Sequence, residues 1–61
     1  MFNLGEVRKF SRLVNGEIET LEGRIVGRTF QSVGERRYDF KVGDHIVLDI
    51  LEGNIDELST N

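Results

Sequence analysis

The sequence contains no cysteine, no proline, no tryptophan and no alanine, and its one histidine is His45. Without cysteine it can form neither a disulfide framework nor a thiolate metal site, and a single histidine is too few for a zinc site. The lack of cysteine is also typical of proteins from a reducing compartment. We therefore expect no disulfide, no metal and no cofactor.

Long apolar runs are missing as well. No segment approaches the roughly 18 consecutive apolar residues of a membrane-spanning helix, and no basic leader followed by an apolar stretch opens the sequence. These absences predict a cytoplasmic protein that has no membrane partner.

A catalytic set is equally hard to assemble. Nucleophilic catalysis needs a serine, threonine, lysine or cysteine beside a base, and His45 follows the Gly43-Asp44 turn with no serine within several residues. The spacing of the acidic residues matches no calcium loop, so we expect a solvated acidic face, with mimicry of nucleic acid as the alternative. We therefore expect a protein that is not an enzyme and has no small-molecule substrate. The acidic residues concerned are Asp44, Asp49, Glu52, Asp56 and Glu57.

What the sequence has in quantity suits β-structure. Its 61 residues include four phenylalanines and seven glycines beside many valines and isoleucines, a composition that favours pleated strands and turns. One domain spanning residues 1–61 is expected, and a domain of this size buries only roughly 60% of the surface of its unfolded chain. A core this thin favours help from a partner or from self-association.

The dipeptide Asn15-Gly16 predicts a hairpin. Asn-Gly supplies the positive φ angles of a two-residue type I′ turn, and the flanking stretches then match residue by residue in apolar, hydroxyl and opposite-charge pairs. The expected pairs are Leu13 with Ile18, Arg12 with Glu19, Ser11 with Thr20, Phe10 with Leu21 and Lys9 with Glu22.

Glycines divide the rest of the chain into segments of strand length. The second strand is too long to run straight, and Gly23 and Gly27 are the positions where we expect it to bend or bulge. This layout predicts an all-β fold, a small antiparallel barrel of four to five strands. The expected strands cover residues 6–14, 17–30, 36–42 and 45–51, followed by a turn at Gly53-Asn54 and a short element from Ile55.

A helix over residues 4–14 is the alternative, packed on a three- or four-stranded antiparallel sheet in an α+β fold. Gly5 in the first turn and the register about Asn15 weigh against it. Its signals are the helical spacing of Leu4, Val7, Phe10 and Val14 and a capping box of Asn3 and Glu6.

Four stretches of the sequence together resemble the SH3-like small barrels of the Tudor and KOW type: Leu4-Gly5-Glu6-Val7, residues 23–27, Tyr38-Asp39-Phe40 and residues 53–58. Sm-like RNA-binding proteins are a second, weaker resemblance, through residues 13–16 with 23–25 and through residues 50–55. The interval from Gly16 to Gly23 is two residues longer than the Sm-like pattern, and Glu52 replaces a basic residue. Both resemblances imply an SH3-like barrel, and the departures argue against RNA binding of the Sm type.

Charge is uneven along the chain: residues 24–41 sum to +3, whereas residues 42–61 contain five acidic residues and no basic one. On an extended strand Arg24, Val26, Arg28 and Phe30 would share one face, and a hairpin would return Arg36, Arg37 and Tyr38 beside them. Guanidinium groups pair with phosphate and aromatic rings stack on bases, so this pattern is typical of a surface that binds single-stranded nucleic acid. In the alternative interpretation Val26, Phe30 and Phe40 belong to the core, and the arginines solubilise the edge.

The stretch 46–51 is unusually apolar. If Ile46, Leu48 and Ile50 face the interior, Val47 and Leu51 lie on the outer face, where they would form a contact surface. Coverage by the C-terminal segment, through Ile55 or Leu58, is the alternative.

These observations favour a non-enzymatic protein-interaction module or small regulator or inhibitor that binds a protein partner or itself, as a homo-oligomer, through Val47, Leu51 and its charged edges. Phage-encoded inhibitors and adaptors are comparable in size. The alternative function is RNA or single-stranded DNA binding. The residues expected to bind nucleic acid are Arg24, Arg28, Phe30, Arg36, Arg37 and Tyr38.

Overall fold

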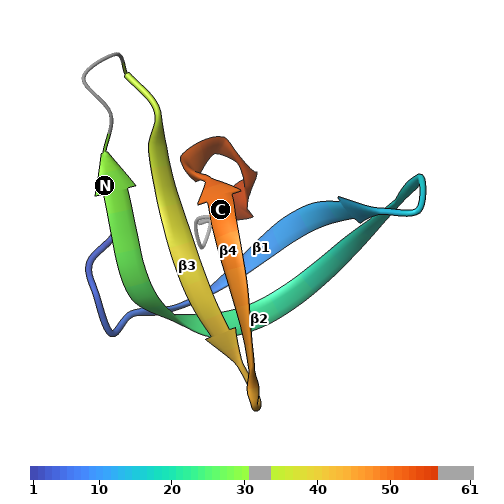
Figure 1. Ribbon diagram of the computed structural model, residues 1–61, viewed down its shortest axis with the longest axis horizontal. Coiled ribbons are helices and arrows are strands. Elements are labelled where there is room, and N and C mark those ends of the chain that lie inside the picture. Colours follow the sequence, from blue (N-terminus) through green and yellow to red (C-terminus); the bar gives the residue numbers. More distant parts are fainter. Residues whose placement is uncertain (31–33, 57–61) are drawn as a thin grey trace.

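The computed structural model describes residues 1–30 and 34–56. They form one antiparallel sheet of five strands in the order β4-β3-β2-β1-β5, of which β1 to β4 are labelled in Figure 1. The predicted all-β fold is confirmed, and the helix proposed for residues 4–14 is wrong. Among these residues β4 and β5 pair with β3 and β1 and not with each other, so the sheet is open and does not close into a barrel. The elements are β1 (Val7–Val14), β2 (Glu17–Phe30), β3 (Arg36–Val42), β4 (His45–Leu51), the 3-10 turn η1 (Glu52–Asn54) and β5 (Ile55–Asp56).

The β1–β2 hairpin has the predicted turn and register. Asn15 and Gly16 both have positive φ, 53° and 82°, as a type I′ turn requires. All five expected residue pairs are found. Arg12 Nε donates to Glu19 Oε1 at 2.9 Å, so a predicted charge pair is formed as well.

The segment before β1 shows why its helical signals were misleading. Asn3 and Glu6 do contact each other, since the Asn3 N–H donates to Glu6 Oε1 at 3.1 Å. The contact closes a turn and not a helix, because Gly5 between them has φ +90° and its N–H donates to the Ile25 carbonyl of β2 at 2.8 Å. A capping pair thus stabilises the entry into a strand.

The core lies on the concave face of the sheet. Phe10 of β1 and Phe40 of β3 stack with their ring centroids 4.2 Å apart, and the Phe2 ring packs edge-on against Tyr38 at 5.6 Å. Leu21, Val42 and Val47 pack around these residues. The buried apolar residues are Phe2, Phe10, Ile25, Tyr38, Phe40, Ile50 and Ile55.

β2 bulges between Ile25 and Gly27, which confirms one of the two predicted bends. A Cβ on Gly27 would lie 2.5 Å from Asp39 Oδ2, so only glycine allows that carboxylate to lie over β2. Gly23 is required for a similar reason, because its Cβ would lie 2.7 Å from the carbonyl oxygen of Lys41.

A second bulge, which the sequence did not indicate, lies in β4. Tyr38 pairs with Ile50 but Phe40 pairs with Val47, so β4 contains one residue more than β3 across this interval. Asp49 adopts φ 60° there, and its N–H donates to Asp39 Oδ1 at 3.0 Å. Asp39 therefore contacts both bulges.

No helix within residues 1–30 and 34–56 has the length and apolar character needed to cross a membrane.

Candidate functional site

Arg28, Phe30 and Arg36 form a basic-aromatic cluster where β2 ends and β3 begins. The register places Arg28 opposite Tyr38 and Phe30 opposite Arg36, so the side chains share the face that carries the core. Arg28 Cζ lies 5.5 Å and Arg36 Cζ 5.8 Å from the centroid of the Phe30 ring, within the range of cation–π contacts. Phe30 is 47% exposed, so its ring remains accessible.

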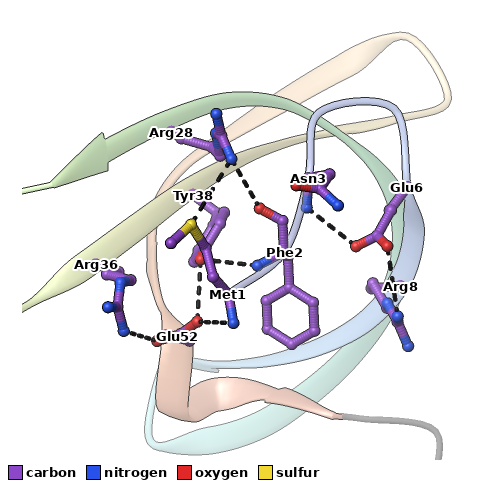
Figure 2. Close-up of polar contacts among 9 residues, drawn as sticks. All are labelled: Met1, Phe2, Asn3, Glu6, Arg8, Arg28, Arg36, Tyr38 and Glu52. Carbon is purple, nitrogen blue, oxygen red and sulfur yellow. Dashed lines mark hydrogen bonds and ion pairs between the residues drawn. The ribbon is translucent and has the colours of Figure 1, made fainter.

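Glu52 of η1 neutralises one side of this cluster (Figure 2). Its Oε1 accepts a hydrogen bond from Arg36 Nη1 at 3.2 Å, and its Oε2 accepts one from the Tyr38 hydroxyl at 3.0 Å. The Met1 amino group lies 3.3 Å from the same Oε2. Glu52 thus joins η1 to β3 and to the first residue.

These contacts shift the pKa of both Tyr38 and Glu52. Burial raises the pKa of the Tyr38 hydroxyl, a hydrogen bond from the Phe2 N–H opposes that shift, and the bond to Glu52 adds to it. Burial also opposes ionisation of Glu52, but the hydrogen bonds from Tyr38, Arg36 and the amino terminus outweigh it and lower its pKa. Glu52 is therefore a carboxylate and Tyr38 a neutral donor near neutral pH.

An open groove of about 370 Å³ borders the cluster. Its charged lining side chains are Arg36, Glu35 and Glu52, so carboxylates outnumber the one cation. Arg28 differs from Arg36 because its Nη1 donates to the Phe2 carbonyl at 3.2 Å and, in the described residues, to no carboxylate. Arg28 is thus the cluster's less neutralised cation.

The other residues expected to bind nucleic acid lie elsewhere. Arg24 lies on the outer face and donates to the Gly5 carbonyl at 2.9 Å. Arg37 pairs with Glu35 at 2.9 Å, and its side chain also belongs to the outer face. The Tyr38 ring is fully buried and cannot stack on a base. The structure therefore brings Arg28, Phe30 and Arg36 together and separates Arg24 and Arg37 from them.

The expected contact surface on β4 needs a correction. Val47 packs against the core, opposite the buried Phe40, whereas Leu51 lies on the outer face as expected, opposite Arg37, and is 36% exposed. Ile46 and Leu48 were expected inside but are 51% and 62% exposed, whereas Ile50 is buried as expected. The bulge at Asp49 is the cause, because one additional residue reverses which side chains face the core.

Ile46 and Leu48 therefore form the outward apolar pair of β4. They lie on an edge strand, because β4 pairs only with β3 in the part of the chain that the structure describes. Ile55, one of the two residues expected to cover this strand, is buried but belongs to β5 at the opposite edge of the sheet. Leu58, the other, lies outside the described residues. The sequence analysis assigned Ile46 and Leu48 to the interior. Their alternation with Val47 showed only that the pair and Val47 lie on opposite faces, and not which face is buried.

The tip of the β1–β2 hairpin carries a second outward apolar pair. Leu13 and Ile18 are 71% and 76% exposed and lie directly opposite each other. The hairpin projects away from the rest of the sheet in Figure 1. The register predicted from the sequence already placed these residues together, but only the structure shows that nothing covers them among residues 1–30 and 34–56.

Catalytic or metal-binding groups do not gather elsewhere in the described part of the chain. It contains no cluster of three or more His, Cys, Asp or Glu side chains suited to a metal. His45 is an exposed strand residue. Of the acidic residues singled out from the sequence, Glu52 is engaged as above, Asp44 and Asp49 are exposed, Asp56 lies in β5 opposite Lys9, and Glu57 lies outside the described residues.

No protein-family model, no curated protein and no solved structure matches the chain. Function is therefore inferred from the geometry of the chain's own residues.

Proposed function

We propose that this protein is a non-enzymatic protein-binding module of the cytoplasm that binds an extended segment of a partner by strand addition at the free edge of β4. The observation that carries the proposal is the exposed pair Ile46 and Leu48 on that edge strand. Edge strands offer unpaired backbone groups to another chain, and natural proteins usually protect them with charge or cover. Here two large apolar side chains mark the edge instead.

The backbone of β4 directs the right groups outward. Gly43 and Asp44 form a two-residue loop, so Val42 and His45 are the pair that flanks it. From this pair on, hydrogen-bonded and non-hydrogen-bonded residue pairs alternate along β3 and β4. The alternation directs the backbone N–H and C=O groups of Ile46 and Leu48 toward the free edge. The residues with exposed side chains therefore also supply the free backbone groups.

Charge indicates the kind of segment that fits. Asp44 and Asp49 flank the apolar pair, and residues 42–61 contain no lysine or arginine. A partner strand with apolar side chains at its centre and basic side chains toward its ends would match both features. A small regulator or inhibitor that captures a basic segment is the role that this edge supports. The SH3-like resemblance is also supported, because a single 3-10 turn, η1, leads the chain from β4 to β5 at the opposite edge of the sheet.

The test titrates the isotope-labelled protein with a synthetic peptide that has a valine-containing centre and lysines at both ends, and with the same peptide carrying glutamates at both ends as control. We expect amide shifts centred on Ile46 and Leu48 with the basic peptide, and weaker shifts with the acidic one. Ile46→Lys should abolish the shifts, whereas Ile18→Lys, at a still more exposed site off β4, should leave them unchanged. Absence of shifts on β4 at about 1 mM peptide would rule out the proposal, since even a Kd of that size would be seen.

Binding of single-stranded nucleic acid is a second candidate, favoured by the accessible Phe30 ring with two guanidinium groups beside it. Against it, the net charge is −3 and Arg36 is already paired with Glu52. Labelled oligonucleotide binding should weaken with salt, and Arg28→Ala should reduce the salt slope by about 0.7 for one lost phosphate contact. Arg24→Ala is the matched control, because Arg24 lies on the other face. No binding at low salt would remove this candidate.

A further inference from the structure

The part of the β1–β2 hairpin beyond the body of the sheet is here called the arm, residues 11–22. β5 pairs with β1 only at Lys9 and Phe10, and β3 pairs with β2 only from Arg24 onward. Both edges of the arm therefore lack a partner strand among the described residues. An isolated two-stranded ribbon is only marginally stable in water, so a free arm is a candidate for association.

The free edge of β1 presents particular backbone groups. Residues that flank a two-residue turn exchange both backbone hydrogen bonds, and bonded and non-bonded pairs then alternate. Val14 and Arg12 therefore direct their N–H and C=O groups toward β2, whereas Leu13 and Ser11 direct theirs to the free edge. Lys9 follows the same alternation, and it pairs with Asp56 of β5 at that edge.

The apolar pattern of the hairpin reverses along the arm. Near the body, Phe10 and Leu21 face the core side, as paired residues of one face must. Toward the tip, that side carries the Arg12–Glu19 ion pair, and the apolar pair Leu13 and Ile18 faces the other way. The outer face of the arm tip is therefore apolar where this chain offers nothing to cover it.

We propose that two copies of this chain associate through antiparallel pairing of their β1 edges, centred on Leu13. A two-fold axis at Leu13 lets the two Leu13 residues exchange both backbone hydrogen bonds. It places Arg12 opposite Val14 of the second copy, so no like charges face each other. The result is a four-stranded ribbon, β2-β1-β1-β2, whose outer face carries an unbroken row of Ile18, Leu13, Leu13 and Ile18.

Charge favours the β1 edges over the β2 edges. In β1, Arg12 is the one charged residue of the free edge, and Glu19 already neutralises it at 2.9 Å. In β2, a two-fold pairing centred on Ile18 would place Glu17 opposite Glu19 of the second copy, and like charges directly opposite are destabilising. Self-association by the acidic edge is thus disfavoured, and two-fold dimers are the commonest oligomers.

The surface beside the β1 edge leaves room for the second strand. An open groove of about 130 Å³ runs there, lined by Ser11, Arg12, Leu13, Ile18 and Asn54. Antiparallel pairing about Leu13 extends over residues 11–15 of each copy and stops before Phe10, where Ile55 of β5 already pairs with β1. The contact is small compared with stable interfaces, and we expect a Kd in the range of about 10 μM to 1 mM.

Cysteine cross-linking tests the pairing, because the natural chain has no cysteine. The two Leu13 positions would lie about 5.5 Å apart between Cα atoms, within the range for a disulfide. The two Ile18 positions would be three strand spacings apart, about 14 Å. Leu13→Cys should therefore form a disulfide-linked dimer under mild oxidation at least tenfold faster than the equally exposed Ile18→Cys. Equal rates, or faster linking through Ile18→Cys, would overturn the proposal.

Sedimentation of the unmodified chain supplies an independent measurement. We expect concentration-dependent dimers that Leu13→Lys disperses, whereas Thr20→Lys, which adds the same charge to the outer face but not to the edge, retains them. A strict monomer up to about 1 mM would overturn the proposal. Neither measurement involves β4. If no dimer is found, the proposed binding of a peptide at Ile46 and Leu48 is unaffected.

Discussion

Glu52 should stabilise the fold mainly through the Tyr38 hydroxyl. Glu52→Ala removes the acceptor for that hydroxyl, whose ring is fully buried, and leaves its hydrogen without a partner among the described residues. An unsatisfied buried donor costs about 1–3 kcal/mol. The ion pairs with Arg36 and the Met1 amino group join a carboxylate to cations that are about half exposed, 45% and 46%, so each adds less than about 1 kcal/mol. We expect a loss of about 2 kcal/mol in the free energy of unfolding.

A loss of this size is large for so small a chain. Native domains have about 0.05–0.15 kcal/mol of stability per residue, and each kcal/mol lowers the Tm of a domain this small by about 4–8 °C. Urea unfolding of the parent and the variant measures the change directly. Glu35→Ala is the matched control, since Glu35 is also paired with an arginine but is more exposed, and its loss should stay within about 0.5 kcal/mol.

A double-mutant cycle with Tyr38→Phe separates the hydroxyl from the ion pairs. In the Tyr38→Phe background no hydroxyl is left unsatisfied, so Glu52→Ala should cost at least about 1 kcal/mol less than in the parent chain. Equal costs in both backgrounds, or a cost no larger than that of Glu35→Ala, would refute the assignment of Glu52's effect to Tyr38.

Three further outcomes are expected. The lowered pKa of Glu52 means that its stabilisation is complete above the ordinary glutamate pKa of 4.5 and is lost as pH falls through the lower folded value; urea midpoints should therefore fall more on acidification in the parent than in Glu52→Gln. Gly23→Ala should destabilise by about 1–3 kcal/mol, measured by thermal unfolding, because its Cβ would overlap the Lys41 carbonyl. Asp39→Ala should cost about 1 kcal/mol and accelerate hydrogen exchange of the Asp49 amide, which loses its acceptor.

The first third of the fold could be predicted because its determinants are local. The Asn15-Gly16 turn and the residues on either side specify one register, and a slip by one residue would turn Phe10 out of the core and Ser11 toward it. Strand boundaries followed from the glycines for the same reason, since the turns at Gly16 and Gly43 require positive φ. Local chemistry therefore determines where this chain turns.

The faces of the later strands could not be predicted in the same way. Alternation places Arg24 and Arg28 on one face only if β2 is regular, but the bulge between Ile25 and Gly27 puts them on opposite faces. In β4 the bulge at Asp49 places Leu48 and Ile50 on opposite faces, and no glycine in the sequence marks this bulge. The errors at Arg24, Val47 and Leu48 thus have the same kind of cause, a single additional residue whose position depends on contacts between strands.

Those contacts converge on Asp39. It pairs with Gly27 in β2 and accepts the Asp49 N–H of β4, so one carboxylate on the central strand of three adjoins both bulges. The bend that they make carries Arg28 to the concave face and Leu48 to the outer one. Because the two candidate binding surfaces depend on the same bend, a change at Asp39 that relaxes the bulges should alter both surfaces together, although neither surface includes Asp39 itself.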